Sequence, residues 1–246
     1  MRPDANWFPF WHPVAEARAR LLCLPCAGAG ASMFQRWRRL LPDVEILAAQ
    51  LPGREQRLRE VPRRDLGALV AELAGALATL PRAAAPLPLA VLGHSMGALV
   101  GFALCQAMRG PGSPCRLFVA GSRAPHLAPR RQLHALPLQD LLDELVVLGG
   151  LSPQARVEPL LVELIEPVLR ADLHLAETSV LSGAPPLSIP IHVFGGRDDA
   201  HVQATELEAW RDATTGSCTI DILPGGHFFV VDHAADVAQR LRARLP

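Results

Sequence analysis

Short apolar runs alternate with longer amphipathic segments along most of the chain. The short runs predict strands covered on both faces, because such strands need few polar side chains. In the longer segments apolar residues recur at helical spacing, as at Leu66, Leu69 and Val70, which predicts helices packed against a sheet. The expected strands span residues 20–24, 44–48, 87–92, 116–120, 191–194 and 217–223, and the expected helices span residues 33–41, 65–80, 98–108 and 234–245.

This alternation of strand and helix indicates βαβ units and a mostly parallel central sheet flanked by helices, which is the α/β class. The length of 246 residues, half of them hydrophobic, suits one domain spanning residues 1–246. In open parallel sheets, ligands bind beyond the carboxyl ends of the strands. Functional residues are therefore expected directly after the predicted strands.

Residues 124–178 interrupt the alternation. This stretch carries no clear strand pattern, and its helical patterns are broken by prolines and glycines: Pro129, Pro137, Gly149, Gly150, Pro153, Pro159 and Pro167. We expect a helical lid inserted over the functional site. The alternative, ordinary surface helices of the core fold, stays open at this stage.

The charge balance excludes two classes of partner. The chain has 24 basic and 24 acidic residues, so it carries no electrostatic signature for nucleic acid or for an anionic membrane surface. No apolar run approaches the roughly 18 residues that a membrane-spanning helix needs. In the absence of heptads or unusual apolar segments, we expect a monomer.

The cysteines and the first residues bear on the cellular compartment. Cys23 and Cys26 have CxxC spacing but no second pair, and the five cysteines are irregularly placed, so we interpret them as free thiols in a reducing compartment rather than as a redox or zinc site. Residues 1–8 lack the apolar stretch of a signal peptide. We expect a cytoplasmic protein without a metal or cofactor.

Residues 93–97 read Gly-His-Ser-Met-Gly and match the pattern G-x-S-x-G between a predicted strand and a predicted helix. In that context the pattern forms a sharp turn that holds the serine hydroxyl exposed. Glycines on both sides allow the strand and the helix to approach where a Cβ atom would clash. The pattern predicts Ser95 as a nucleophile, against the alternative of a tight turn without a catalytic role.

A serine nucleophile needs a histidine base and a carboxylate that orients it, and in this arrangement the acid lies between the two along the chain. His227 follows a predicted strand and precedes the last predicted helix, where such a base belongs. Asp198 and Asp199 both follow the strand at 191–194. We favour Asp199 as the acid and leave Asp198 open; the unused aspartate is expected to cap the following helix.

Two backbone N–H groups are expected to form an oxyanion hole, which stabilises the negative charge of the transition state. One belongs to Met96, directly after the nucleophile. The other is expected in the loop after the first strand, residues 25–30, where Ala27 is the candidate. The small residues of this first loop are also consistent with simple turn chemistry.

Several segments resemble the type II thioesterases that accompany nonribosomal peptide and polyketide synthases. The resembling segments are Asn-Trp-Phe at 6–8, Leu-Pro-Cys-Ala-Gly-Ala-Gly at 24–30, Gln-Leu-Pro-Gly-Arg-Glu-Gln-Arg at 50–57, the pentapeptide at 93–97, Leu-Arg-Ala-Asp at 169–172 and Gly-His-Phe-Phe at 226–229. The segments at 50–57 and 169–172 discriminate best, because very many hydrolases share the pentapeptide. The chain departs from the family pattern at Cys26, Ala29, Ser179 and Ala200, which bears on substrate preference.

The resemblance implies an α/β-hydrolase fold and hydrolysis of acyl thioesters on the phosphopantetheine arm of a carrier protein, in bacterial antibiotic or siderophore biosynthesis. Ser95 would take the acyl group, His227 would move the proton, and residues 124–178 would form the lid. Carrier domains are typically acidic, so Arg54, Arg57 and the pair Arg130–Arg131 are candidate docking residues; the alternative for each is a solvated surface charge.

Three other functions remain open from the sequence. A general carboxylesterase or lipase would use the same three residues on oxygen esters. A hydrolase-fold scaffold subunit of a synthase would use none of them, and an enzyme that transfers the acyl group or cyclises it would use an acceptor other than water.

Overall fold

A computed structural model describes residues 6–80, 87–110 and 112–246, so the first five residues of the segment considered as a signal peptide lie outside it. Six strands form one sheet in the order β2-β1-β3-β4-β5-β6, and every neighbouring pair is parallel. The predicted α/β class with a mostly parallel sheet is confirmed. The strands are β1 (Ala19–Leu24), β2 (Val44–Ala48), β3 (Leu89–His94), β4 (Pro114–Ala120), β5 (Ile191–Gly196) and β6 (Cys218–Leu223).

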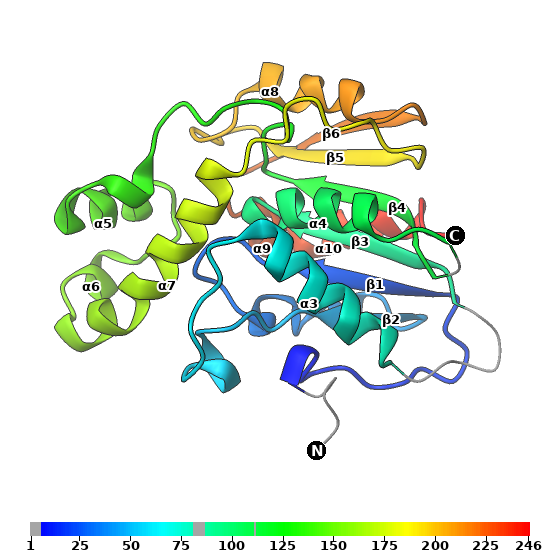
Figure 1. Ribbon diagram of the computed structural model, residues 1–246, viewed down its shortest axis with the longest axis horizontal. Coiled ribbons are helices and arrows are strands. Elements are labelled where there is room, and N and C mark those ends of the chain that lie inside the picture. Colours follow the sequence, from blue (N-terminus) through cyan, green and yellow to red (C-terminus); the bar gives the residue numbers. More distant parts are fainter. Residues whose placement is uncertain (1–5, 81–86, 111) are drawn as a thin grey trace.

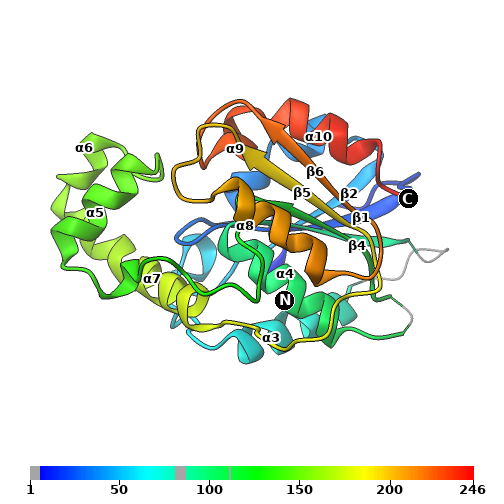
Figure 2. The same ribbon diagram turned by 90° about the horizontal axis from the view of Figure 1, so that it is seen from above.

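Helices cover both faces of this sheet (Figures 1 and 2). One face packs against α3 (Leu66–Ala78), α4 (Met96–Ala107), α8 (Ala204–Glu208) and the 3₁₀ helix η4 (Ala209–Ala213). The other face packs against η1 (Ala31–Phe34), α2 (Trp37–Leu40), α9 (Phe229–Asp232) and α10 (Ala234–Arg242). The short 3₁₀ helices η2 (Glu55–Arg57) and η3 (Leu133–Ala135) lie in connecting segments.

Strand β1 shows why the predicted strands are almost continuously apolar. Leu22 and Leu24 belong to the core under α3 and α4, whereas Leu21 and Cys23 belong to the core under α2 and α10. Successive side chains of a strand point to opposite faces. Because both faces are covered, both sets of side chains must be apolar.

The continuous helix expected at residues 33–41 is wrong. The segment forms two short turns, η1 and α2, instead. Both turns direct an aromatic ring into the core: Phe34 and Trp37 are fully buried, with ring centroids 5.8 Å apart. Packing of these two large rings determines the backbone path here and overrides the helical pattern.

Residues 124–178, called the helical segment below, contain α5 (Leu138–Val147), α6 (Pro153–Arg156) and α7 (Pro159–Thr178) and no strand. Helices α5 and α6 stand off from the sheet beyond the ends of its strands (Figures 1 and 2). The carboxyl-terminal half of α7 returns to the core, where Leu175 is fully buried. Ala124, at the other end of the segment, is also fully buried in this core. The segment is therefore anchored to the core at both ends, and its middle stands off.

All five cysteines are free thiols, and Cys23, Cys26 and Cys105 are buried. Burial raises the pKa of the Cys26 thiol to about 12, with the nearby charge of Asp172 acting in the same direction. Within the described ranges, no helix is both long enough and apolar enough to cross a membrane.

Candidate active site

Ser95 lies at the turn between β3 and α4 with an unusual backbone conformation, φ 52° and ψ −116°. Two glycines make this turn possible. A Cβ atom on Gly93 would lie 2.2 Å from the carbonyl oxygen of Gly97, and one on Gly97 would lie 2.2 Å from the carbonyl oxygen of Leu24. Both separations are far below van der Waals contact. Such backbone strain is typical of functional sites, where it aims a side chain at a ligand.

His227 and Asp199 form a buried hydrogen-bonded pair. Nδ1 of His227 donates to Oδ2 of Asp199 at 2.9 Å. The other carboxylate oxygen accepts the backbone N–H groups of His201 at 2.8 Å and Val202 at 3.2 Å. Burial raises the pKa of Asp199, but the hydrogen bond and charge of His227 and the two N–H groups outweigh it, so this pKa lies below its ordinary value. The carboxylate is therefore ionised and holds the imidazole in one orientation.

Asp198 takes no part in this pair. Its side chain is exposed, and its backbone N–H donates to the carbonyl oxygen of Gly225 at 3.0 Å. The structure thus brings Asp199, rather than its neighbour, to His227. The expectation that the unused aspartate caps the following helix is wrong, because Gln203 is the N-cap of α8.

His94 connects the turn at Ser95 to the loop of His227. Its side chain is fully buried, and Nε2 donates to the carbonyl oxygen of His227 at 2.9 Å. Burial, with the charge of His227 acting in the same direction, lowers the pKa of His94 to about 3. A neutral imidazole at this position is therefore a fixed hydrogen-bond donor. Sequence reasoning missed this role; the signal for it was a histidine ending an otherwise apolar strand.

The hydroxyl of Ser95 and Nε2 of His227 have no hydrogen-bond partner in the part of the chain that the structure describes. Hydrogen bonds between catalytic groups often form only when substrate is bound. Ser95 is partly exposed. Both groups are therefore available to a ligand.

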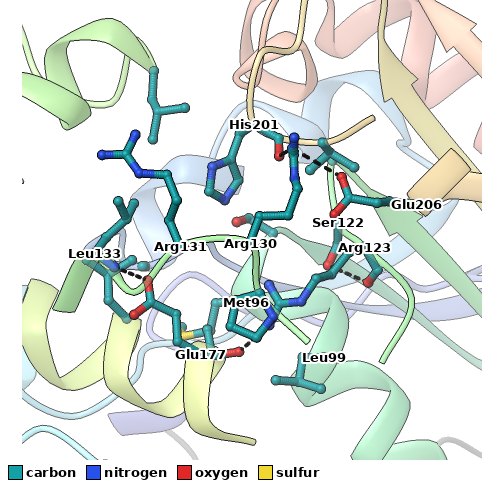
Figure 3. Close-up of a pocket in the computed structure, with 18 of the residues that line it drawn as sticks. Met96, Leu99, Ser122, Arg123, Arg130, Arg131, Leu133, Glu177, His201 and Glu206 are labelled. Carbon is teal, nitrogen blue, oxygen red and sulfur yellow. Dashed lines mark hydrogen bonds and ion pairs between the residues drawn. The ribbon is translucent and has the colours of Figure 1, made fainter. Parts of the chain in front are cut away.

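A cavity of about 420 Å³ lies in front of Ser95. Met96 and Leu99 of α4 form its base, and Arg130, His201 and Glu206 form one side (Figure 3). On the opposite side Glu177 accepts the backbone N–H of Leu133 at 2.9 Å (Figure 3). The ring of His201 also contacts that of His227, with centroids 5.2 Å apart, so the cavity adjoins the imidazole.

Ala27 and Met96 both border this cavity together with Ser95. Within the described residues, the backbone N–H of neither residue donates a hydrogen bond to another protein group. Two unpaired N–H donors beside an exposed hydroxyl are the arrangement that stabilises a developing oxyanion. Met96 is also the first residue of α4, where the helix dipole favours negative charge.

The interpretation of Arg54 and Arg57 as docking residues or solvated charges is wrong, because both side chains are buried. Arg54 forms an ion pair with Asp172, with Nη1 2.5 Å from Oδ2. Arg57 pairs with Glu60 at 2.7 Å, and its guanidinium lies 4.2 Å from the ring centroid of Trp7. The contacts of Arg54 with Asp172 and of Arg57 with Trp7 join residues far apart along the chain, so a local sequence pattern does not reveal them.

Arg130 and Arg131 do lie at the rim of the cavity, and their side chains are exposed by 44% and 58%. Each has a carboxylate partner: Arg130 pairs with Glu206 at 3.2 Å and Arg131 with Glu144 at 2.8 Å.

A comparison with protein families assigns the chain to a known family. The family model described as thioesterase domain matches residues 19–245. The chain belongs to the thioesterase family. The gramicidin S biosynthesis protein GrsT of Aneurinibacillus migulanus is 36% identical over 231 residues, which cover 92% of this chain and 89% of GrsT.

Solved structures of thioesterases resemble the whole chain. RedJ, a thioesterase from the prodiginine biosynthetic pathway in Streptomyces coelicolor, superposes with a TM-score of 0.86 at 36% identity and covers 98% of this chain and 99% of its own. YbtT, a type II thioesterase from the yersiniabactin NRPS/PKS pathway, superposes with a TM-score of 0.86 at 30% identity and covers 96% of both chains. These likenesses confirm the α/β-hydrolase fold and the resemblance to type II thioesterases that the sequence segments indicated.

Proposed function

We propose that this thioesterase is a type II enzyme that hydrolyses acyl thioesters from the phosphopantetheine arm of carrier proteins of a nonribosomal peptide or polyketide synthase. The observation that carries the proposal is the strained serine turn, which opens on a cavity bordered by two unpaired N–H donors. Family membership and the biosynthetic pathways of the relatives support the choice of a thioester as substrate.

In this proposal Ser95, His227 and Asp199 act as a catalytic triad. The hydroxyl oxygen of Ser95 attacks the thioester carbonyl carbon while Nε2 of His227 accepts the hydroxyl proton. His227 then gives that proton to the departing thiol of phosphopantetheine. A water molecule next attacks the acyl ester of Ser95, again losing a proton to His227, and the free acid leaves as Ser95 recovers its proton.

Two further groups assist this sequence. The ionised Asp199 stabilises the imidazolium form of His227 and keeps Nδ1 protonated, so that Nε2 faces the reaction. The N–H groups of Ala27 and Met96 stabilise the negative charge on the carbonyl oxygen, a contribution worth about 3 kcal/mol for each donor in related chemistry.

The remaining features of the proposal concern the surroundings of the site. Residues 124–178 serve as the lid of a single domain spanning residues 1–246, and the cavity under them receives the acyl chain. The five free thiols favour a reducing, cytoplasmic location. We expect a monomer that meets its carrier protein transiently and needs no metal or cofactor.

The decisive experiment compares three substrates with the same acyl group: an acyl carrier protein, an acyl N-acetylcysteamine and an acyl p-nitrophenyl ester. We expect the highest kcat/KM for the carrier protein. Ser95→Ala should abolish turnover of all three, whereas Ser122→Ala, which changes the other serine bordering the cavity, should retain it. Efficient turnover of the p-nitrophenyl ester without preference for the carrier would instead identify a general carboxylesterase.

A further inference from the structure

We propose that the buried ion pair Arg54–Asp172 positions the oxyanion hole. The pair holds the first loop (residues 25–30) in the position from which the N–H of Ala27 can donate a hydrogen bond to the carbonyl oxygen of the substrate. This inference rests on the proposed function. It assigns a role to two residues that lie outside the triad and do not border the cavity.

The pair joins two segments that are far apart along the chain. Arg54 follows β2, and Asp172 lies 118 residues later, on α7. The contact is bidentate: Nη1 of Arg54 lies 2.5 Å from Oδ2 and Nη2 lies 2.9 Å from Oδ1 of Asp172. Only 6% of the arginine side chain and 3% of the aspartate side chain are exposed. A bidentate contact between a guanidinium and a carboxylate fixes both the orientation and the distance of the two groups.

Asp172 makes a third contact, and this one reaches the first loop. Its Oδ2 accepts the backbone N–H of Gly28 at 2.8 Å. Gly28 directly follows Ala27 and has a φ of +77°, a conformation that favours glycine. Leu169, one turn before Asp172 on α7, packs closely against Gly28. A Cβ atom on Gly28 would lie only 2.5 Å from Cδ2 of Leu169. Helix α7 thus holds Gly28 through a hydrogen bond and through packing.

Arg54 holds the other end of the first loop. Its Nη1 donates to the carbonyl oxygen of Ala29 at 3.3 Å. Gln50 continues the network: its amide donates to the carbonyl oxygen of Arg54 at 2.9 Å and accepts the N–H of Ala31 at 3.2 Å. Hydrogen bonds therefore fix the loop at Gly28 and Ala29 and, directly after it, at Ala31, while the N–H of Ala27, which borders the cavity, remains unpaired.

The contact with Gly28 separates a positioning role from a merely stabilising one. A buried ion pair is weak evidence for stability, since apolar residues of similar volume often replace it without loss. Apolar residues cannot accept the N–H of Gly28, however. A displacement of about 1 Å at a catalytic group lowers rates about a hundredfold, so a loosened first loop should be visible in catalysis even where folding is intact.

The first test is Asp172→Asn, measured with an acyl N-acetylcysteamine. We expect kcat to fall about tenfold to a hundredfold, which is less than the loss from removing an oxyanion donor altogether, while KM stays within about threefold of the wild-type value. Titration of Ser95 with a fluorophosphonate normalises kcat to the folded, reactive fraction. The rate of Ser95 phosphonylation should fall in parallel, because the phosphoryl oxygen occupies the oxyanion site.

A double variant distinguishes positioning from stability. Arg54→Met with Asp172→Leu replaces the pair by apolar side chains of similar size. We expect its melting temperature to approach that of the wild type, while kcat per reactive serine stays at or below that of Asp172→Asn, because leucine offers no acceptor for the N–H of Gly28. Recovery of kcat together with the melting temperature would overturn the inference.

Arg170→Gln is the matched control on the same helix. Arg170 donates to the carbonyl oxygens of His134 and Leu136 at 2.9 Å each, in the helical segment rather than in the first loop. This variant should keep the wild-type kcat per reactive serine. A loss equal to that of Asp172→Asn would show a general effect of α7 and would also overturn the inference. If wild-type Ser95 fails to react with the fluorophosphonate, the proposed function fails instead.

Discussion

The two walls of the cavity are built in different ways. On the sheet side, the loops that follow β1, β3, β5 and β6 carry Ala27, Ser95, Asp199 and His227, and buried hydrogen bonds and close backbone packing hold them. On the opposite side, the part of the helical segment that stands off from the sheet, from α5 to the start of α7, includes exposed contacts such as the ion pair of Arg156 with Asp143, whose side chains are 31% and 55% exposed.

This difference has an energetic reason. Exposed ion pairs contribute about 0–1 kcal/mol each, whereas disruption of buried packing costs several times more. Val147 and Leu160 of the helical segment are 76% and 75% exposed, so their replacement loses little burial. The sheet side therefore constrains the chemistry tightly, whereas the exposed surface of the helical segment, at residues such as Val147 and Leu160, tolerates substitution.

The largest effect is expected at the acid. Asp199→Asn should lower kcat about 10⁴-fold, because an amide in place of the carboxylate favours the wrong tautomer of His227. Asp198→Asn is the control on the adjacent residue and should leave kcat at the wild-type value, since its side chain is exposed. Steady-state kinetics on both variants tests this. Equal losses would show that the hydrogen bond between Asp199 and His227 does not define the acid.

A glycine substitution measures the steric constraint on the sheet side. Gly97→Ala should lower the free energy of unfolding by about 3 kcal/mol, because its Cβ atom would overlap the backbone at Leu24. Gly75 lies within α3, and a Cβ atom added there would meet no neighbouring group within 4 Å, so Gly75→Ala should instead raise the free energy of unfolding by about 0.5–1 kcal/mol. Urea denaturation gives both values. A tolerated Gly97→Ala would mean that the turn at Ser95 can relax.

Acid sensitivity is expected to arise in part on the sheet side, at His94. Its pKa is about 3 in the folded chain and about 6.5 in the unfolded chain. Between these pH values the unfolded chain binds a proton that the folded chain does not, so acidification below pH 6.5 destabilises the fold. This one residue should account for a loss of about 2 kcal/mol at pH 5.

Two variants test the contribution of His94. His94→Asn retains an N–H donor for the carbonyl of His227 but no longer titrates, so its free energy of unfolding should fall about 2 kcal/mol less between pH 7 and pH 5. His12→Asn changes an exposed histidine and should keep the wild-type dependence. Identical pH profiles for the wild type and His94→Asn would contradict the assignment.

The smallest effect is expected on the exposed surface of the helical segment. Val147→Ser and Leu160→Ser change two equally exposed residues, and each should alter the free energy of unfolding by less than about 0.5 kcal/mol. Val147 borders the cavity and Leu160 does not. Only Val147→Ser should raise KM for medium-length acyl thioesters, by about threefold, which follows from the loss of about one methylene contact. A loss above 2 kcal/mol in the free energy of unfolding of either variant would contradict the expected difference in sensitivity between the two sides of the cavity.

The strands, the class of fold and the chemistry-bearing residues could be predicted because they leave local signals. Apolar runs indicated β1 to β6, and spacing around Ser95 and His227 indicated their loops. The sequence favoured Asp199 but left Asp198 open, because the choice depends on which side chain the turn after β5 directs inward. Arg54 was misinterpreted for a similar reason: its partner lies 118 residues away, and nothing near the arginine reveals it.

The burial of Cys26 has a consequence for the fate of the acyl group. Hydrolysis of a thioester releases a thiol. A thiolate close to Ser95 would compete for the acyl group, because thiolates are strong nucleophiles. Cys26 directly precedes Ala27, yet its pKa of about 12 keeps it protonated at neutral pH. The fold thus keeps the one thiol of the first loop buried and protonated, which makes it a poor nucleophile.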